Sequence, residues 1–271
     1  MKIAFATCVQ LGRSCIEEIL HLGGHFDLFI TLKDDQARQK SGRIYLDDLA
    51  EREGTPLLKI RHINDPETLD ALKAHDIDWL FIIGWSQIAN QTLLDTPKRG
   101  IIGMHPTLLP KGRGRAAIPW ASLKGLKETG VTMFKMDAGV DTGDILAQGR
   151  IPMEPDITAT ELYEKVDRMH VELMGRTWED IVNGTIAPVP QDHSQATQWP
   201  GRKPEDGEIF STMTMEEADR MVRAVTHPYP GAFYRSEEGT LRIWSAKVSP
   251  EKGRIPLADG WLEPVDYKNE E

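Results

Sequence analysis

A continuous apolar run at residues 79–83, Trp-Leu-Phe-Ile-Ile, constrains the fold more than any other segment of this 271-residue chain. A strand that is apolar at every position must be covered on both faces, which is typical of a parallel sheet with helices on each side. Apolar segments at 1–6, 26–32 and 56–60 precede it and alternate with segments of helical periodicity. This alternation predicts an α/β fold with a Rossmann-like, mainly parallel sheet and helices on both faces.

The remaining elements follow from periodicity and from capping residues. Thr158 and Glu161 form a capping box at the start of a long amphipathic helix that should end near Gly184. The expected helices cover 12–22, 44–53, 66–75, 91–95, 116–124 and 215–224. Further strands are expected at 100–104, 129–136, 145–151, 232–235 and 241–248. A loop is expected at 33–43, and the polar C-terminus is expected to be frayed.

Domain boundaries are expected where composition changes. A segment rich in Pro, Gln and Ser with little periodicity separates the two parts of the chain, which is typical of a linker. We therefore predict a catalytic domain at 1–186, a linker at 187–205 and a small mixed α+β C-terminal subdomain at 206–271.

Charge and composition exclude several classes of partner. The net charge of −10 argues against nucleic acid, because neutralising phosphates needs a concentrated basic surface. Only two cysteines, no signal-like opening and no apolar run near the ~18 residues of a membrane span predict a cytoplasmic protein without a membrane partner. No metal site is expected, because Gly23 and Gly24 should end the helix between His21 and His25.

His105 is the strongest candidate for chemistry. It follows the expected strand 100–104 in a loop rich in Pro and Gly, and ligands bind at the carboxyl ends of parallel strands. Asp141 lies 36 residues later in a second Gly-rich turn, where it could accept a hydrogen bond from one ring nitrogen and fix the tautomer of the other. The alternatives are a structural histidine and an aspartate that only caps Gly143.

Arginine and tryptophan side chains are the other ligand candidates. Arg113 and Arg115 bracket Gly114 after the histidine, and each could be a solvated charge or a contact for phosphate or carboxylate. Trp85 and Trp120 are expected in the core, whereas Trp199 lies in a polar segment and is the better candidate for ring stacking.

At these residues the chain resembles the 10-formyltetrahydrofolate-dependent formyltransferases, whose pattern is Asn-x-His-x-Ser-Leu-Leu-Pro followed by an Asp-x-Gly turn. The resemblance runs through 105–110, with Thr107 for the usual Ser, and through 140–143. Residues 113–115 and 129–132 extend it toward the methionyl-tRNA and sugar-nucleotide branches. Segments 201–207, 221–225 and 228–233 look like the short second domain of sugar N-formyltransferases such as UDP-4-amino-4-deoxy-L-arabinose formyltransferase, and a methionyl-tRNA formyltransferase usually has a longer, more basic one.

The resemblance implies a function and a set of site residues. The donor would be 10-formyltetrahydrofolate, and the acceptor would be the amine of a UDP- or dTDP-linked amino-deoxysugar used in polysaccharide biosynthesis. Catalytic positions would be His105, as general base or proton shuttle, Asp141 and Gly103. The folate pocket would take Gln87, Ile88, Ala89, Arg115, Asp137, Ala138, Gly139 and Val140. Substrate-binding positions would be Arg113, Trp199 and Arg202. A homodimer is an open possibility.

Gly103 departs from the family, which has Asn two residues before the histidine. That amide helps to hold an oxyanion, and losing one such donor costs about a hundredfold or more in rate. A water or backbone N–H could fill the gap, a residue elsewhere could replace the Asn, or the chain could be a weakened or redirected relative; we favour the first. Two other functions stay open: formyl transfer to another amine such as methionyl-tRNA, and non-catalytic binding of folate or a nucleotide sugar.

Overall fold

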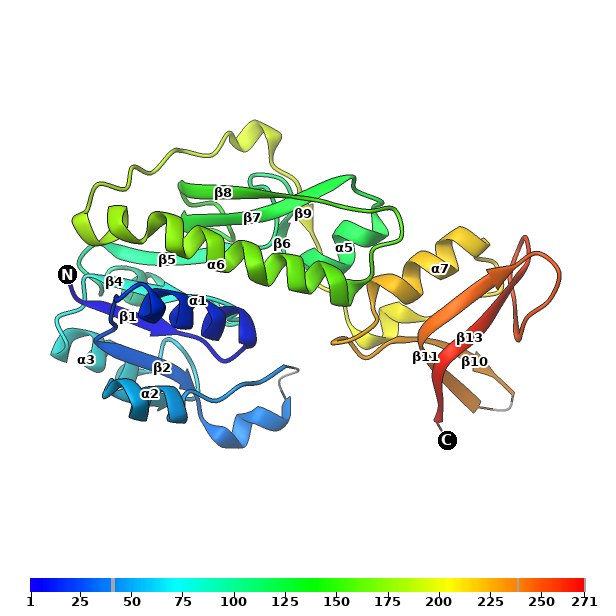
Figure 1. Cartoon of the computed structure of the whole chain (residues 1–271), viewed down its shortest axis with the longest axis horizontal. Coiled ribbons are helices and arrows are strands. Elements are labelled where there is room, and N and C mark those ends of the chain that lie inside the picture. The colour runs from blue at the N-terminus through cyan, green and yellow to red at the C-terminus, as the bar shows by residue number, and fades with distance from the viewer. Residues whose placement is uncertain (40–41, 238, 271) are drawn as a thin grey trace. The chain divides into compact units, whose positions relative to one another are not determined.

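Seven strands form the main sheet in the computed structural model, which describes residues 1–39, 42–237 and 239–270. The strand order is β3-β2-β1-β4-β5-β7-β8; the first five strands are parallel, and β7 is antiparallel to β5. The strands are β1 (Ile3–Ala6), β2 (Leu28–Leu32), β3 (Leu57–Ile60), β4 (Trp79–Ile82), β5 (Gly100–His105), β7 (Glu128–Lys135) and β8 (Ile145–Pro152). The predicted mainly parallel α/β sheet is confirmed (Figure 1).

Helices cover both faces of this sheet. They are α1 (Gln10–His21), α2 (Asp47–Glu53), α3 (Pro66–Ala74), α4 (Gln91–Leu94) and α6 (Ala159–Asn183). On one face, Leu80 packs in a buried cluster with Leu72 of α3 and Leu93 of α4. On the other face, Phe81 lies 6.4 Å from the ring of Trp178 in α6. Successive strand residues alternate between faces, so the continuous apolar run of β4 has a partner layer on each side.

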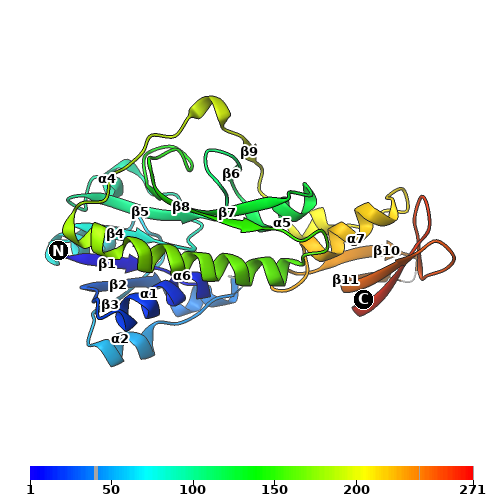
Figure 2. The same cartoon turned by 45° about the horizontal axis from the view of Figure 1, so that its top comes forward.

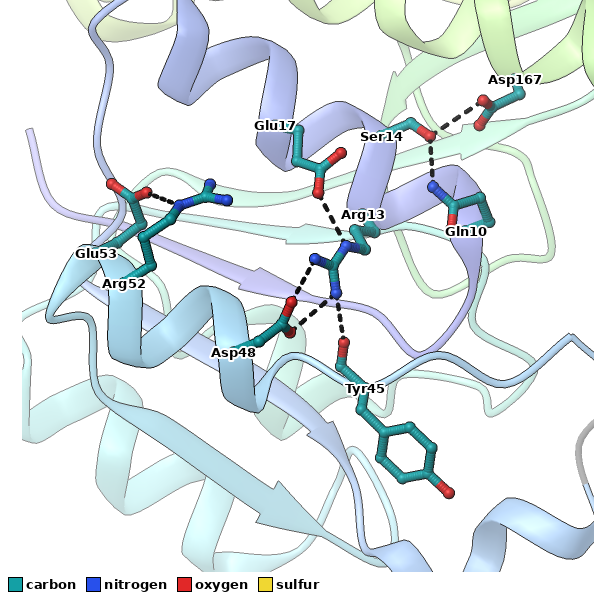
Figure 3. Close-up of polar contacts among 9 residues, drawn as sticks. All are labelled: Gln10, Arg13, Ser14, Glu17, Tyr45, Asp48, Arg52, Glu53 and Asp167. Carbon is teal, nitrogen blue, oxygen red and sulfur yellow. Dashed lines mark hydrogen bonds and ion pairs between the residues drawn. The ribbon is translucent and has the colours of Figure 1, made fainter.

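Polar contacts fasten α1 to its neighbours (Figure 3). The Arg13 guanidinium donates to Glu17 at 2.9 Å and to Asp48 at the start of α2 at 2.7 Å. Hydrogen bonding to Arg13 lowers the pKa of the exposed Asp48 carboxyl. On the opposite side, the Ser14 hydroxyl donates to Asp167 of α6 at 3.0 Å, and burial raises the pKa of that carboxyl. Figure 2 shows α1 and α6 side by side along the sheet.

Contacts divide the chain into two compact units. The first comprises Met1–Arg113, Gly130–Ile151 and Val166–Gln198; the second comprises Gly114–Thr129, Pro152–Lys165 and Trp199–Glu271. Residues 187–198, expected to be a linker, therefore belong with the main sheet. The division into domains at 1–186 and 206–271 stays a prediction.

The second unit contains a four-stranded sheet of order β10-β11-β13-β12 with α5 (Ala117–Leu123) and α7 (Met215–Ala224). Its strands are β10 (Ala232–Ser236), β11 (Gly239–Ser249), β12 (Ile255–Pro256) and β13 (Trp261–Glu270). Ala218 and Val222 of α7 pack in one buried cluster with Leu241 and Ile243 of β11. The amphipathic face of α7 is thus buried against the sheet.

Two local predictions differ from the structure, and the linker stays a prediction. The C-terminal residues up to 270, expected to be frayed, belong to β13, which pairs with β11 from Ser249↔Trp261 to Thr240↔Glu270, because main-chain pairing does not require apolar side chains; residue 271 lies outside the described residues. The expected loop at 33–43 contains a 3-10 helix, η1 (Asp34–Gln39), and residues 40 and 41 of that segment lie outside the described residues. The expected linker contains η2 (His193–Gln195) and β9 (Gln198–Trp199), which pairs with β6 (Arg113–Gly114). Within the described part of the chain, no helix is long and apolar enough to cross a membrane.

Candidate active site

His105 is the last residue of β5, and its neighbours on both sides are strands of the main sheet. Its strand pairs with β4 through Ile82↔Gly103 and with β7 through His105↔Thr132. The histidine is 8% exposed, so its ring can form only a few specific contacts. The sheet therefore holds His105 in a fixed, nearly dry environment at the carboxyl end of β5.

The two ring nitrogens of His105 have different neighbours. Nε2 lies 2.8 Å from the carbonyl oxygen of Gly112, which can only accept, so Nε2 carries the proton and donates it. Nδ1 faces Asp141, with 3.7 Å between Nδ1 and Oδ2, which is too long for the hydrogen bond expected from the sequence. Gly112, and not Asp141, thus sets the tautomer, and Nδ1 is the nitrogen that can take up a proton.

The turn that carries Asp141 is shaped by its own side chains and glycines. Asp137 accepts hydrogen bonds from the Gly139 amide at 3.0 Å and from the Thr142 hydroxyl at 2.6 Å. Asp141 has a φ of +55°, the left-handed region that non-glycine residues rarely adopt. A Cβ on Gly143 would lie 1.7 Å from the Lys135 carbonyl oxygen, so only glycine fits there. Glycine at position 143 is therefore a steric requirement of this turn.

Arg113 is buried, and its side chain is hydrogen-bonded inside the protein. It is 5% exposed, and its guanidinium donates to Gln191 Oε1 at 2.6 and 3.2 Å and to His193 Nδ1 at 3.0 Å. The Gln191 amide donates in turn to the carbonyls of Asp141 and Gly143, at 2.9 and 2.6 Å. Nε and Nη2 of Arg113 are used inside the protein, which does not favour a substrate contact, and the expected role of Arg113 in substrate binding stays a prediction.

The loop after β4 contains Gln87, Ile88 and Ala89, which the resemblance placed in the folate pocket. Gln87 uses both ends of its amide to bind the segment between β3 and α3, accepting from the Ile63 amide at 2.7 Å and donating to the Arg61 carbonyl at 2.9 Å. Ala89 is buried in the core, whereas Ile88 is 70% exposed. Among these three, Ile88 alone has a side chain free to cover a ligand, and Gln87 maintains the loop.

Arg115, Trp199 and Arg202 gather in the second unit. Trp199 is only 9% exposed and accepts a backbone hydrogen bond from Arg115, so its predicted role as a stacking surface does not fit its burial. Trp120, expected in the core, is partly exposed instead; its Nε1 donates to the Pro200 carbonyl, and the Arg202 guanidinium lies 5.0 Å from its ring centroid. The Arg115 side chain is exposed.

Side chains already occupy the space beside Gly103. A Cβ built there would lie 3.2 Å from the Met136 thioether and 3.3 Å from the Phe134 ring. We expected a water or a backbone N–H in the gap left by the missing Asn. Atoms of the Met136 and Phe134 side chains line the position of that Cβ and supply no donor to an oxyanion, and the replacement of the missing amide by a water or a backbone N–H stays a prediction.

His170 is a buried histidine that sequence reasoning missed. It lies in α6 with 1% exposure, and its Nδ1 donates to the Val166 carbonyl at 2.8 Å. Burial lowers the pKa of His170 to about 4, the hydrogen bond to Val166 opposes this shift, and the electrostatic interaction with His105 adds to it. Its position four residues after Val166, on the apolar stripe of the helix, was the sequence signal that could have predicted its burial.

Across the residues with described positions, no cluster of His, Cys, Asp or Glu could hold a metal.

Protonation of His170 should make the protein acid-sensitive. Folding lowers the pKa from 6.5 to about 4, so the unfolded chain binds the proton more tightly and stability falls as the pH drops from about 6.5 towards 4. At pH 5 the loss is about 2 kcal/mol. In His170→Asn the fall in Tm from pH 7 to pH 5 should therefore be smaller than in wild type. His21→Asn, at an exposed position, is the control; an equal fall in all three proteins would contradict the assignment.

Two family models match the chain. The model described as formyl transferase matches residues 20–177, and the formyl transferase C-terminal domain matches residues 202–260. His105, Asp141, Gly103 and the loop after β4 all lie inside the first match.

Curated relatives are similar to this chain in sequence, and solved structures share its fold. A methionyl-tRNA formyltransferase of Geobacter sulfurreducens is 34% identical over 76% of this chain, which spans 64% of that relative's length. One from Chlamydia caviae is 32% identical over 93% of this chain and 81% of its own length. The structure of a Helicobacter canadensis N-formyltransferase, in complex with folinic acid and dTDP-3-aminofucose, has a TM-score of 0.73 at 19% identity and covers 99% of this chain and 100% of its own.

Proposed function

The chain belongs to the formyl transferase family, and on that premise we propose that it transfers a formyl group from 10-formyltetrahydrofolate to a primary amine. Members of this family are enzymes that use this folate as formyl donor. The observation that carries the proposal is the buried His105, with Nε2 bound to the Gly112 carbonyl and Nδ1 3.7 Å from Asp141.

When an amine becomes a formamide, its nitrogen bonds to the formyl carbon and loses one proton, while the bond from that carbon to folate N10 breaks and N10 gains one proton. In this proposal Nδ1 of His105 takes the proton from the amine and passes it to N10. Because Nε2 keeps its own proton on the Gly112 carbonyl, the ring has one open lone pair, on Nδ1. Once Nδ1 is protonated, the nearby Asp141 carboxylate stabilises the charged ring. His105 is therefore the proton acceptor in this proposal, and Asp141 supports its charged state.

The first unit also offers surface suited to a folate. The exposed Ile88 and Val140, at 70% and 50% exposure, present apolar side chains that a flat heteroaromatic ring could cover. Residues 137–140, in the Asp141 turn, are all exposed. When bound, 10-formyltetrahydrofolate would supply the formyl group. The protein would supply the shape of the turn and the proton acceptor.

For the acceptor we propose the amine of a UDP- or dTDP-linked amino-deoxysugar. Between residues 202 and 271 acidic side chains outnumber basic ones by fourteen to ten, which does not favour a tRNA backbone. The Helicobacter canadensis structure of the same fold was solved with such a nucleotide sugar. Methionyl-tRNA is the second candidate, because the relatives at 32–34% identity carry that name.

One experiment separates these functions. The purified protein is incubated with 10-formyltetrahydrofolate and, separately, with UDP-, dTDP- and GDP-linked amino sugars and with methionyl-tRNA, and the products are identified by mass. A formylated sugar supports the proposal, and formylmethionyl-tRNA supports the second candidate. Folate binding without any product would indicate a binding protein, and the absence of both binding and product would contradict the whole proposal.

Substitution of Gly103 tests whether the missing amide limits the rate. Gly103→Asn should cost about 1–2 kcal/mol of stability, because Met136 and Phe134 must move by a few tenths of an ångström. In the double variant Gly103→Asn/Met136→Ala the amide has room, and we expect kcat to exceed that of Met136→Ala by about 10-fold or more. Equal kcat values in these two variants would show that residue 103 does not face the reacting carbonyl.

A further inference from the structure

Gln191 lies between the two halves of the His105 site, in a segment that the sequence marked as linker. We infer that Gln191 is a positioning residue, which sets the place of the Asp141 turn relative to His105. The inference rests on the proposed function only for its kinetic consequence, because the geometry that it describes exists without any substrate.

The orientation of the Gln191 amide is unambiguous. The side chain is buried, at 5% exposure, and its Oε1 accepts from the Arg113 guanidinium at 2.6 and 3.2 Å. Its Nε2 donates to the carbonyls of Asp141 at 2.9 Å and Gly143 at 2.6 Å. A flipped amide would set NH₂ against a cation and an oxygen against two carbonyls, so all four contacts would be lost. One buried amide therefore joins two loops in a single orientation.

One end of this amide stabilises an unfavourable backbone. Asp141 has a φ of +55°, and the left-handed conformation costs a non-glycine residue about 1–2 kcal/mol. Gln191 binds the carbonyl of Asp141 itself and that of Gly143, two residues on. Strained residues persist only where surrounding contacts hold them. Without the two hydrogen bonds from Gln191 Nε2, fewer contacts hold the Asp141 turn in the conformation that places its carboxylate 3.7 Å from Nδ1 of His105.

The Oε1 end of the Gln191 amide is connected, through Arg113 and Gly112, to Nε2 of His105. Arg113, which binds Oε1, directly follows Gly112, and the Gly112 carbonyl accepts from Nε2 of His105. Thr197 fixes this loop as well: its hydroxyl accepts from the Gly112 amide at 2.8 Å, and its carbonyl accepts from the Arg113 amide at 2.9 Å. The segment 191–197 thus holds the groups that face both ring nitrogens of His105.

Two substitutions separate the two ends of the amide. Gln191→Met keeps the length of the side chain and removes all four hydrogen bonds. Gln191→Glu keeps an acceptor for Arg113 but has no N–H for the carbonyls of Asp141 and Gly143. The matched control is Gln195→Met, the same change at an exposed residue of the same segment.

The first measurement is hydrogen exchange of wild type and variants by mass spectrometry, without substrate. We expect faster exchange at 137–144 in both Gln191 variants and no change in Gln195→Met. This readout does not depend on turnover. If wild type transfers no formyl group, the proposed function fails, and the exchange data still decide whether Gln191 holds the turn. Exchange at 137–144 that is equal in all four proteins would overturn the inference.

The second measurement is steady-state kinetics. A displaced Asp141 should lower kcat by about 10- to 100-fold in both Gln191 variants, with KM for each substrate changed less than about threefold. The pH profile of kcat should shift in the same variants, which a general loss of stability would not produce. Because Gln191 would act through Asp141, adding Gln191→Met to Asp141→Asn should lower kcat no further. Fully additive losses, or a change in KM alone, would contradict the positioning role.

Discussion

Replacing His105 by alanine should lower kcat for formyl transfer by about 10²- to 10⁴-fold, the range that a positioned general base contributes. The variant loses the only open ring nitrogen beside Asp141 and also the donor to the Gly112 carbonyl. The side chain is not part of the exposed apolar surface at Ile88 and Val140, so folate affinity should change by less than about threefold. Single-turnover kinetics and titration with folate measure the two effects separately.

Two controls make the result specific. His21→Ala removes an exposed histidine at the end of α1 and should leave kcat unchanged. Added imidazole should restore part of the lost activity of His105→Ala, since it can occupy the space of the ring and accept the proton. Turnover of His105→Ala within a factor of about three of wild type would exclude His105 as the base.

Gly143→Ala should cost about 3 kcal/mol or more of folding free energy. A Cβ at this position would lie 1.7 Å from the Lys135 carbonyl oxygen, and a backbone atom of β7 cannot move aside without breaking strand pairing. The alternative is displacement of the Asp141 turn, which would lower formyl transfer as well. Thermal unfolding should show a Tm lower by about 6–12 °C.

Gly201→Ala is the matched control for this clash. An added Cβ there would lie 3.6 Å from Cδ of the Arg115 side chain, an ordinary contact. Its stability should stay within about 1 kcal/mol of wild type. If Gly143→Ala were as stable as Gly201→Ala, the tight turn after β7 would not exist as described.

The elements with a strong repeating pattern could be predicted from the sequence. The apolar run at 79–83 required cover on two faces, and Leu72, Leu93 and Trp178 supply it. The capping box was likewise predictable, because the Thr158 amide donates to Glu161 at 2.9 Å within one turn of chain. Burial periodicity and capping act over a few residues, so their signals are present in the linear sequence.

The meeting of His105 and Asp141 could also be anticipated, because each follows or precedes a predicted strand of one sheet. The distance between the two side chains and the partner of each ring nitrogen could not be anticipated. The Gly112 carbonyl holds Nε2, and the distance to Asp141 is 3.7 Å, neither of which spacing along the chain can specify. The family pattern marked Gly103 as unusual, but only the packing of β5 against Met136 shows what occupies the space.

By itself, then, the sequence determined the strands of the main sheet and the helices that cover it, the mainly parallel α/β architecture, and the two loops that carry His105 and Asp141. Only the tertiary structure determined which hydrogen-bond partners the polar residues have. Arg113 was a plausible ligand contact and Gln191 part of a linker, yet the two are buried against each other 78 residues apart. The physical reason is that an amide or a guanidinium has no preferred neighbour in sequence; its partner is whichever unsatisfied group the folded backbone brings within hydrogen-bond distance.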